Sequence, residues 1–163
     1  MLVARQLSKH TTESSDKTID GARLQVLLAF DNSVGSDNAV QTLESLPIGE
    51  SADIVVVTVM TVVKYYRVDI MERMDEFWQN RKLEAETALA ATSKRLKQTI
   101  PNVSTQLVEG ESVSGTVLDK AKELDADLII MGHKGKSAID RFLLGSVSND
   151  VVHHAPCSVL IVR

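Results

Sequence analysis

Residues 127 to 146 read DLIIMGHKGKSAIDRFLLGS, and this stretch decides how the chain is expected to fold. Leu128 to Met131 is a short apolar run typical of a buried strand. Gly132, Gly135 and Gly145-Ser146 follow, and residues 147 to 154 have the pattern of a helix. Glycine lets the backbone approach a ligand closely, and the free N–H groups of a helix N-terminus favour anions. The stretch therefore predicts a place for a polyphosphate, with the Ser146 hydroxyl donating to it or capping the helix.

Strand-like and helix-like segments alternate along the rest of the chain. Apolar runs ended by turn residues predict strands, and apolar residues at helical spacing predict helices. We expect strands over 24–30, 53–60, 103–108, 128–131 and 158–162, and helices over 36–46, 69–99, 113–124 and 147–154. This alternation predicts an α/β fold: a single doubly wound domain with a five-stranded, mainly parallel sheet and helices on both faces. The expected strand order is 3-2-1-4-5.

Polar residues follow the first expected strand as well as the fourth. Asp31-Asn32-Ser33 ends the first strand, and in the order 3-2-1-4-5 it would neighbour the glycine loop across the point where strand order reverses. Asp31 could contact ribose hydroxyls or help hold a metal on phosphates, or it could be a turn or N-cap residue. Both interpretations stay open, whereas for Ser33 we favour capping.

Charged residues inside the glycine loop suit an anionic ligand. Lys134, Lys136 and Arg141 could neutralise a triphosphate together with backbone amides, although Asp140 would offset one of them in a solvated loop. We expect His133 to be a surface residue, although it could approach a phosphate. The spacing matches neither the P-loop nor the dinucleotide fingerprint.

The full spacing, Gly132-x2-Gly135-x9-Gly145-Ser146, resembles the ATP-binding motif of the universal stress protein family. Three other segments resemble the family's first, fourth and C-terminal strands, so the likeness covers roughly residues 22 to 163; these segments are residues 24–33, 127–132 and 155–162. The resemblance implies that the protein binds ATP, with Mg²⁺ on the phosphates. Residues Met131 to Lys136 and Gly145 to Val147 would line the binding site. It also implies that Ala29 and Val59 pack near adenine.

As a member of this family, the chain would be a regulatory stress-response protein that binds ATP. No clear water-activating base is present, so at most slow hydrolysis is expected. The alternative is an ATP-hydrolysing or adenylate-forming enzyme on the same fold, with Asp31 or Asp140 as weak candidate bases. The resemblance further implies a homodimer in which the free edge of strand 159–162 pairs with its twofold mate.

Composition bounds the remaining expectations. The chain has 163 residues and a formal net charge of −4, so no attraction to nucleic acid is expected. Residues 1–20 are mainly polar and predict a flexible extension before a domain over 21–163, although Leu2, Val3 and Leu7 could dock on the body or a partner. Apolar runs are too short for a membrane span and a secretory leader is not recognisable, so we expect a cytoplasmic protein without a membrane partner.

Two further groups of residues have structural explanations at this stage. Cys157, the lone cysteine, is expected to be a small buried apolar residue rather than a redox centre. Met71, Met74 and Trp78 are expected to belong to the core or to a lid near the nucleotide, although they could form a partner-binding patch. Histidines are not clustered, and a structural metal site is not expected.

Overall fold

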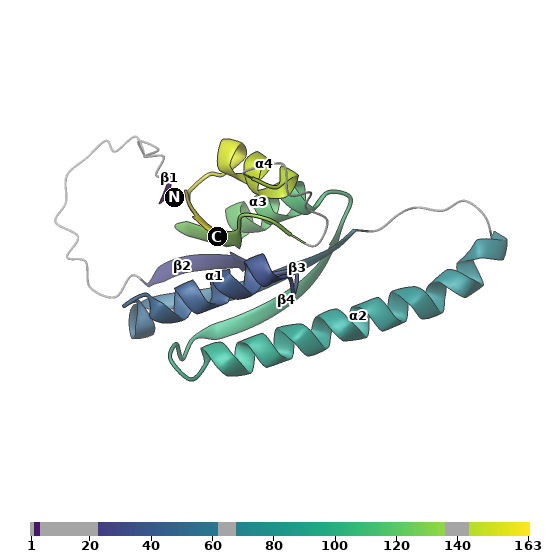
Figure 1. Cartoon of the computed structure of the whole chain (residues 1–163), viewed down its shortest axis with the longest axis horizontal. Coiled ribbons are helices and arrows are strands. Elements are labelled where there is room, and N and C mark those ends of the chain that lie inside the picture. Colours follow the sequence, from purple (N-terminus) through teal and green to yellow (C-terminus); the bar gives the residue numbers. More distant parts are fainter. Residues whose placement is uncertain (1, 4–22, 62–67, 136–143) are drawn as a thin grey trace.

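The computed structural model describes residues 2–3, 23–61, 68–135 and 144–163, with side chains of helix α2 from residue 75 onward (Figure 1). The predicted flexible extension over 1–20 therefore lies outside the described residues except for Leu2 and Val3. Lys136, Asp140 and Arg141 of the glycine loop also lie outside them.

Five parallel strands form the body of the sheet. They are β2 (Leu24–Ala29), β3 (Ala52–Thr61), β4 (Val103–Gly110), β5 (Leu128–Gly132) and β6 (Ser158–Val162). Their spatial order, β4-β3-β2-β5-β6, is the predicted order 3-2-1-4-5. The order reverses between β2 and β5, which pair through Ala29 and Met131 at their carboxyl ends. The predicted topology is confirmed.

Four α-helices cover the two faces of this sheet in the described part of the chain. They are α1 (Val34–Ser45), α2 (Val68–Leu96), α3 (Val113–Glu123) and α4 (Ser146–His154), with a short 3-10 turn, η1 (Gly49–Ser51). Figure 1 shows α3 and α4 above the sheet and α2 below it, with the N-terminal end of α2 projecting beyond the strands. Along the described residues, no helix is both long and apolar enough to cross a membrane.

Alternate residues of the strands point into two separate cores. Val26, Leu28 and Val56 pack with α1 and α2 on one face, whereas Leu27 and Ile129 pack with α3 and α4 on the other. A strand that is buried on both faces needs apolar residues at consecutive positions, which is why these strands read as continuous apolar runs.

An ion-pair group ties α1 to α2. Arg95 donates to both carboxylate oxygens of Glu44, at 2.8 and 2.7 Å, and to Asp37 at 2.8 Å. Hydrogen bonding to Glu44 is the main cause that raises the pKa of Arg95 above its usual value. The C-terminal half of α2 is therefore held against the body, and its own Leu89 and Leu96 are buried in the core.

Nearer its N-terminus, α2 packs more loosely. Trp78 is half-buried and lines a cavity of about 200 Å³ with Met60 and Glu109, so it is not part of the buried core. A lid near the nucleotide and a partner-binding patch stay predictions. Phe77 remains 49% exposed beside it. The side chains of Met71 and Met74 lie outside the described residues.

The outer edge of β6 is occupied by a sixth strand, β1 (Leu2–Val3). Leu2 pairs with Leu160 and Val3 with Val159, antiparallel to β6. The expectation that this edge is free is therefore wrong for the chain as it stands. Apolar residues at positions 2 and 3 supply a strand partner, one of the ways in which proteins cover an exposed sheet edge.

Candidate functional site

A large cavity opens at the carboxyl ends of the strands, where the strand order reverses. Its volume is about 1000 Å³, and we call it the carboxyl-end cavity. Ala29 of β2, Val59 of β3 and Met131 of β5 supply its floor. In doubly wound sheets this is the usual position of a ligand crevice, because the loops after neighbouring strands diverge to opposite faces.

Most of the residues predicted for the site do line this cavity. They are Ala29, Asp31, Val59, Met131, Gly132, Lys134, Gly135, Gly145, Ser146 and Val147. They come from four segments of the sequence, and the sheet brings them together. Lys136 lies outside the described residues.

Beneath the glycine loop, the backbone at Gly132 packs directly against the backbone at Gly35. A Cβ added to Gly132 would lie 2.6 Å from the carbonyl oxygen of Gly35, and one added to Gly35 would collide with the carbonyl of Lys134. Neither neighbour is a side chain that could rotate away, so both positions require glycine. The first turn of α1 therefore lies directly against the end of β5, and this contact sets the wall of the cavity.

Asp31 connects the two loops that were expected to be neighbours. Its Oδ1 accepts from the backbone N–H of Ser33 at 3.1 Å, and its Oδ2 would lie 2.7 Å from a Cβ at Gly135. Ser33 is the N-cap of α1 and exchanges hydrogen bonds with Ser36, which confirms the capping expectation. Asp31 is thus a turn residue that also lines the cavity, so its two interpretations are compatible.

The N-terminus of α4 faces the cavity with its backbone donors. Gly145 is the N-cap, and the first intrahelical bond runs from Asn149 N–H to Gly145 O at 2.9 Å. The N–H groups of Ser146, Val147 and Ser148 consequently have no acceptor within the helix. Ser146 is the first helical residue, so its hydroxyl does not cap α4; that alternative is wrong because glycine occupies the N-cap position.

His133 is the exception among the predicted residues. Its Nδ1 lies 3.2 Å from the carbonyl oxygen of Val162, and its ring is not part of the cavity lining. Its carbonyl accepts from Gly145 N–H at 2.8 Å and from the Ser148 hydroxyl at 2.9 Å. The backbone of His133 therefore fixes the start of α4, while its side chain contacts the end of β6.

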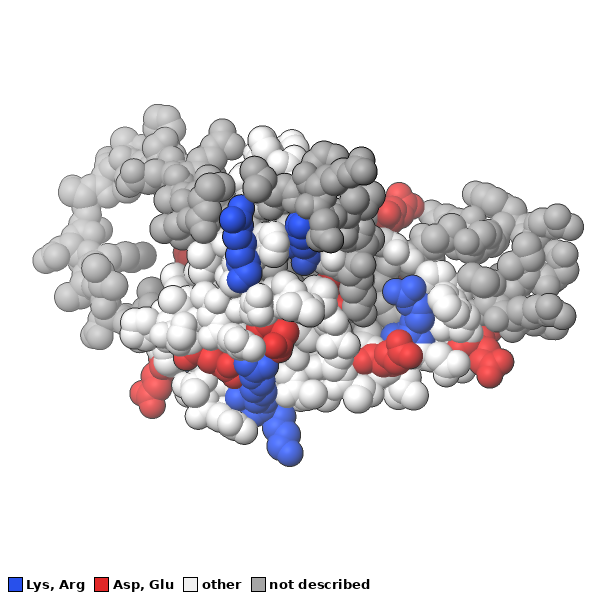
Figure 2. Space-filling view, viewed as in Figure 1, with Lys and Arg blue, Asp and Glu red and all other residues white. Residues whose placement is uncertain are grey.

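Both negatively and positively charged side chains line the cavity. Among the described lining residues, Asp31 is the carboxylate, and Lys134 and Arg81 are the cations. Figure 2 shows acidic and basic side chains interspersed on the visible face of the molecule. The described residues contain no group of three or more His, Cys, Asp or Glu side chains arranged to hold a metal. A cation bound here would need ligands from another molecule, such as phosphate oxygens.

Sequence reasoning missed lining residues from segments far from the glycine loop. They include Thr61, Arg81, Val113 and Val117. Thr61 ends β3, one residue beyond the predicted end at position 60, so a rule that takes the residue after each predicted strand would have included it. Arg81 and the two valines lie on α2 and α3, and their place at the cavity depends on how these helices pack.

Known proteins resemble this chain in sequence and in fold. A sequence model of the "Universal stress protein family" matches residues 23–163. A "Putative universal stress protein" of Staphylococcus aureus strain USA300 is 32% identical over 143 residues, covering 85% of this chain and 82% of that protein. The solved "Universal stress protein UspA from Lactobacillus plantarum" is 26% identical, with a TM-score of 0.77 over 87% of this chain and 99% of that one.

Solved structures at lower identity share the fold and hold adenine nucleotides. A universal stress protein in complex with cAMP is 23% identical, with a TM-score of 0.64 over 87% of this chain and 98% of that one. Proteins of Archaeoglobus fulgidus, with dAMP, and Arabidopsis thaliana, with AMP, are 17% and 16% identical and have TM-scores of 0.62 and 0.59. They cover 87% and 85% of this chain, and 99% and 90% of their own lengths are matched. By its sequence match and its fold, the chain described here belongs to the universal stress protein family.

Proposed function

We propose that this protein binds an adenine nucleotide, ATP with Mg²⁺, in the carboxyl-end cavity. The observation that carries the proposal is the junction of Gly132, Gly35 and the α4 N-terminus. Only glycine fits at the first two positions. The α4 N-terminus presents backbone donors that have no acceptor within the helix to a cavity of nucleotide size. Relatives of the same fold hold cAMP, dAMP and AMP, which supports adenine as the base.

The lining residues suggest how the ligand would lie. Phosphates would accept from the N–H groups of Ser146 and Val147, with Lys134 nearby, as they commonly do at helix N-termini. Adenine would lie toward Ala29 and Val59, where the lining is apolar. Asp31 would complete the coordination of Mg²⁺, which typically takes one or two carboxylates together with phosphate oxygens and waters. The ion would neutralise phosphate charge.

The proposed role is regulatory, in a stress response, with at most slow ATP hydrolysis. Asp31 is the carboxylate of the described lining, and one of its oxygens already accepts from Ser33. A general base must be able to reach the attacking water, and this one is partly engaged. An ATP-hydrolysing or adenylate-forming enzyme is the alternative, and a turnover number above about 1 s⁻¹, the lower end for typical enzymes, would favour it.

The first test is to identify the small molecules that the purified protein releases on denaturation, by chromatography and mass spectrometry. We expect adenine nucleotide, and we expect calorimetry to detect binding of ATP with Mg²⁺ to the emptied protein. If nothing is released and added ATP does not bind, the proposal is overturned.

A sharper test removes a single backbone donor. Ser146→Pro deletes the N–H at the first position of α4, where proline is well tolerated, and Gly145 already has the extended backbone (ψ 159°) that a residue before proline prefers. We expect ATP affinity to fall about tenfold, since hydrogen bonds to charged groups contribute about 1.5 kcal/mol or more. Stability should not change.

The matched control is Val34→Pro, at the first position of α1. Ser33 before it is also extended (ψ 165°), and Val34 is 80% exposed and does not line the cavity. This variant should bind ATP like the original protein. Equal affinities for both proline variants would contradict a role for the α4 N-terminus.

We also propose a homodimer through β6, residues 159–162, of a protein located in the cytoplasm. A second copy can pair with this edge only after β1 leaves it, because Leu2 and Val3 already hold Leu160 and Val159. Replacing both residues by aspartate should release β1 and raise the dimer fraction in sedimentation, whereas replacing both by isoleucine should not. An unchanged monomer in the aspartate variant would argue against dimerisation through this edge.

A further inference from the structure

Helix α2 contributes a cation to the carboxyl-end cavity. Arg81 lines the cavity together with Val59 and Thr61 of β3, the strand that precedes α2. Arg81 lies eight residues before the buried Leu89, and its side chain is exposed. The helix therefore adds a guanidinium to a site that is otherwise built from the strand ends, the loops after them, and helices α1, α3 and α4.

Arg81 differs from the other described arginines that hold tertiary contacts. Arg23 pairs with Asp53 at 2.7 Å, and Arg95 pairs with Glu44 and Asp37. Arg81 makes no ion pair with any described carboxylate; its Cζ lies over the ring of Phe77, 5.7 Å from the centroid. An aromatic neighbour orients the planar group without neutralising its charge.

Arg81 and the glycine loop lie at different sides of the cavity. That loop follows β5, whereas α2 packs on β3 and β4, and β2 lies between β3 and β5. Strands two places apart are separated by roughly 10 Å. Phosphates at the α4 N-terminus would thus leave Arg81 toward the β3 side of the cavity, the side on which the base is proposed to lie.

We propose that Arg81 is a ligand-binding residue that stacks its guanidinium on the adenine ring, with Phe77 holding the guanidinium in place. This inference rests on the proposed nucleotide binding and adds a contact that neither the glycine motif nor the strand ends contain. Arginine suits this role because its planar, weakly hydrated group stacks on aromatic faces, which a lysine ammonium does not do.

Calorimetric titration with two probes, AMP and ATP with Mg²⁺, tests the assignment. Arg81→Ala should weaken the affinity for both nucleotides by the same factor, about twofold to thirtyfold, since a cation over an aromatic face contributes roughly 0.5–2 kcal/mol. Arg81→Lys should lose nearly as much because it keeps the charge and loses the plane. Phe77→Ala should show a smaller loss of the same pattern.

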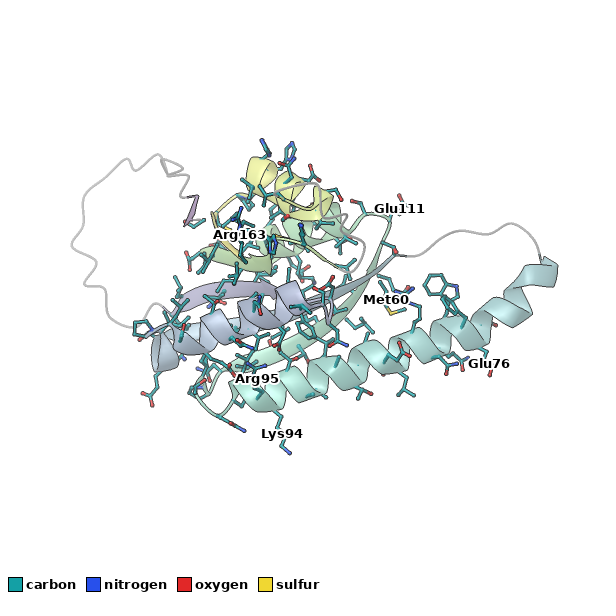
Figure 3. The ribbon with its side chains drawn as sticks, viewed as in Figure 1. Met60, Glu76, Lys94, Arg95, Glu111 and Arg163 are labelled. Carbon is teal, nitrogen blue, oxygen red and sulfur yellow. The ribbon has the colours of Figure 1, made fainter. Side chains whose placement is uncertain are left out.

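Lys94→Ala is the matched control. Lys94 is an exposed cation on the same helix, and Figure 3 shows it pointing away from the body of the protein. This variant should bind both nucleotides like the original protein and should match Arg81→Ala in thermal stability. Removal of one positive charge from α2 is thereby separated from removal of the stacking group.

Each other outcome overturns the inference in a distinct way. A loss for ATP that greatly exceeds the loss for AMP would place Arg81 at the phosphates. Unchanged affinity for both nucleotides in Arg81→Ala would show that it does not contact the ligand, while nucleotide binding itself would stand. Absence of binding to the original protein would instead overturn the proposed function, and this inference with it.

Discussion

At the amino ends of the strands, Arg23 donates to the Asp53 carboxylate at 2.7 Å, and the N–H of Gln25 donates to Asp127 at 2.9 Å. At the carboxyl ends, Asp31 and Lys134 instead line a cavity of about 1000 Å³. Both ends carry charged residues of both signs, so charge does not distinguish them. The difference comes from glycine: at Gly132 and Gly35 the backbones pack so closely that a Cβ has no room, and this contact sets the wall of the cavity.

The largest expected effect comes from breaking that close backbone contact. Gly132→Val would drive a branched side chain into the Gly35 backbone, so we expect complete loss of nucleotide binding and a loss of about 3 kcal/mol in the free energy of unfolding, the upper end for overpacking. Urea denaturation and calorimetry measure both. Gly115→Ala is the control: its Cβ would have ordinary contacts at 3.6 Å, and a helical alanine should raise stability by about 0.5–1 kcal/mol.

The next effect concerns Cys157, which precedes β6 at the amino ends of the strands. Burial, followed by the negative charge of Asp127, raises the pKa of Cys157 to about 11 from 9.0. Two pKa units correspond to roughly a hundredfold less thiolate at pH 8, so iodoacetamide should alkylate the folded protein about a hundredfold more slowly than the denatured chain. Equal rates would show that the thiol is accessible and ionises normally.

The same shift predicts a direction for stability. The folded state disfavours the thiolate. The contribution of the neutral thiol to the free energy of unfolding is therefore complete below pH 9, and it is lost as the pH rises through 11. Cys157→Ser should remove this part of the alkaline decline, as followed by denaturation at several pH values. Unchanged pH dependence in the variant would assign the decline to other groups.

Two matched substitutions compare the ends directly, and the larger effect is expected at the cavity. Asp31→Asn keeps an oxygen that accepts from Ser33, so the turn should persist while the charge is lost. We expect affinity for ATP with Mg²⁺ to fall about tenfold and affinity for AMP without Mg²⁺ to stay the same. An equal loss for both nucleotides would indicate a contact with ribose rather than with the metal.

The smallest effect is expected from Asp53→Asn at the amino end. Its ion pair with Arg23 is partly exposed, 36% for each side chain, so screening by solvent limits its contribution to about 0.5 kcal/mol. Urea denaturation should detect at most that loss, and nucleotide affinity should not change. A tenfold loss of affinity would mean that the two ends of the sheet are coupled.

Most helices and strands were predictable because their apolar periodicity is strong, but their ends were not. β4 continues to Gly110, past the predicted end at Val108, because Met60 and Thr61 of β3 pair with Glu109 and Gly110. The strand β1 was also missed. Two apolar residues before a polar stretch become a strand only when a sheet edge accepts their hydrogen bonds.

The site divides in the same way. The sequence alone determined the glycine spacing, the capping serine and the alternation of strands and helices, because these depend on local backbone preferences and on apolar periodicity. Tertiary structure alone decided that the His133 ring turns to Val162, that Arg81 reaches the cavity, and that the edge of β6 is covered. These contacts join residues far apart in the chain, and side-chain direction across an interface follows from packing rather than from local preference.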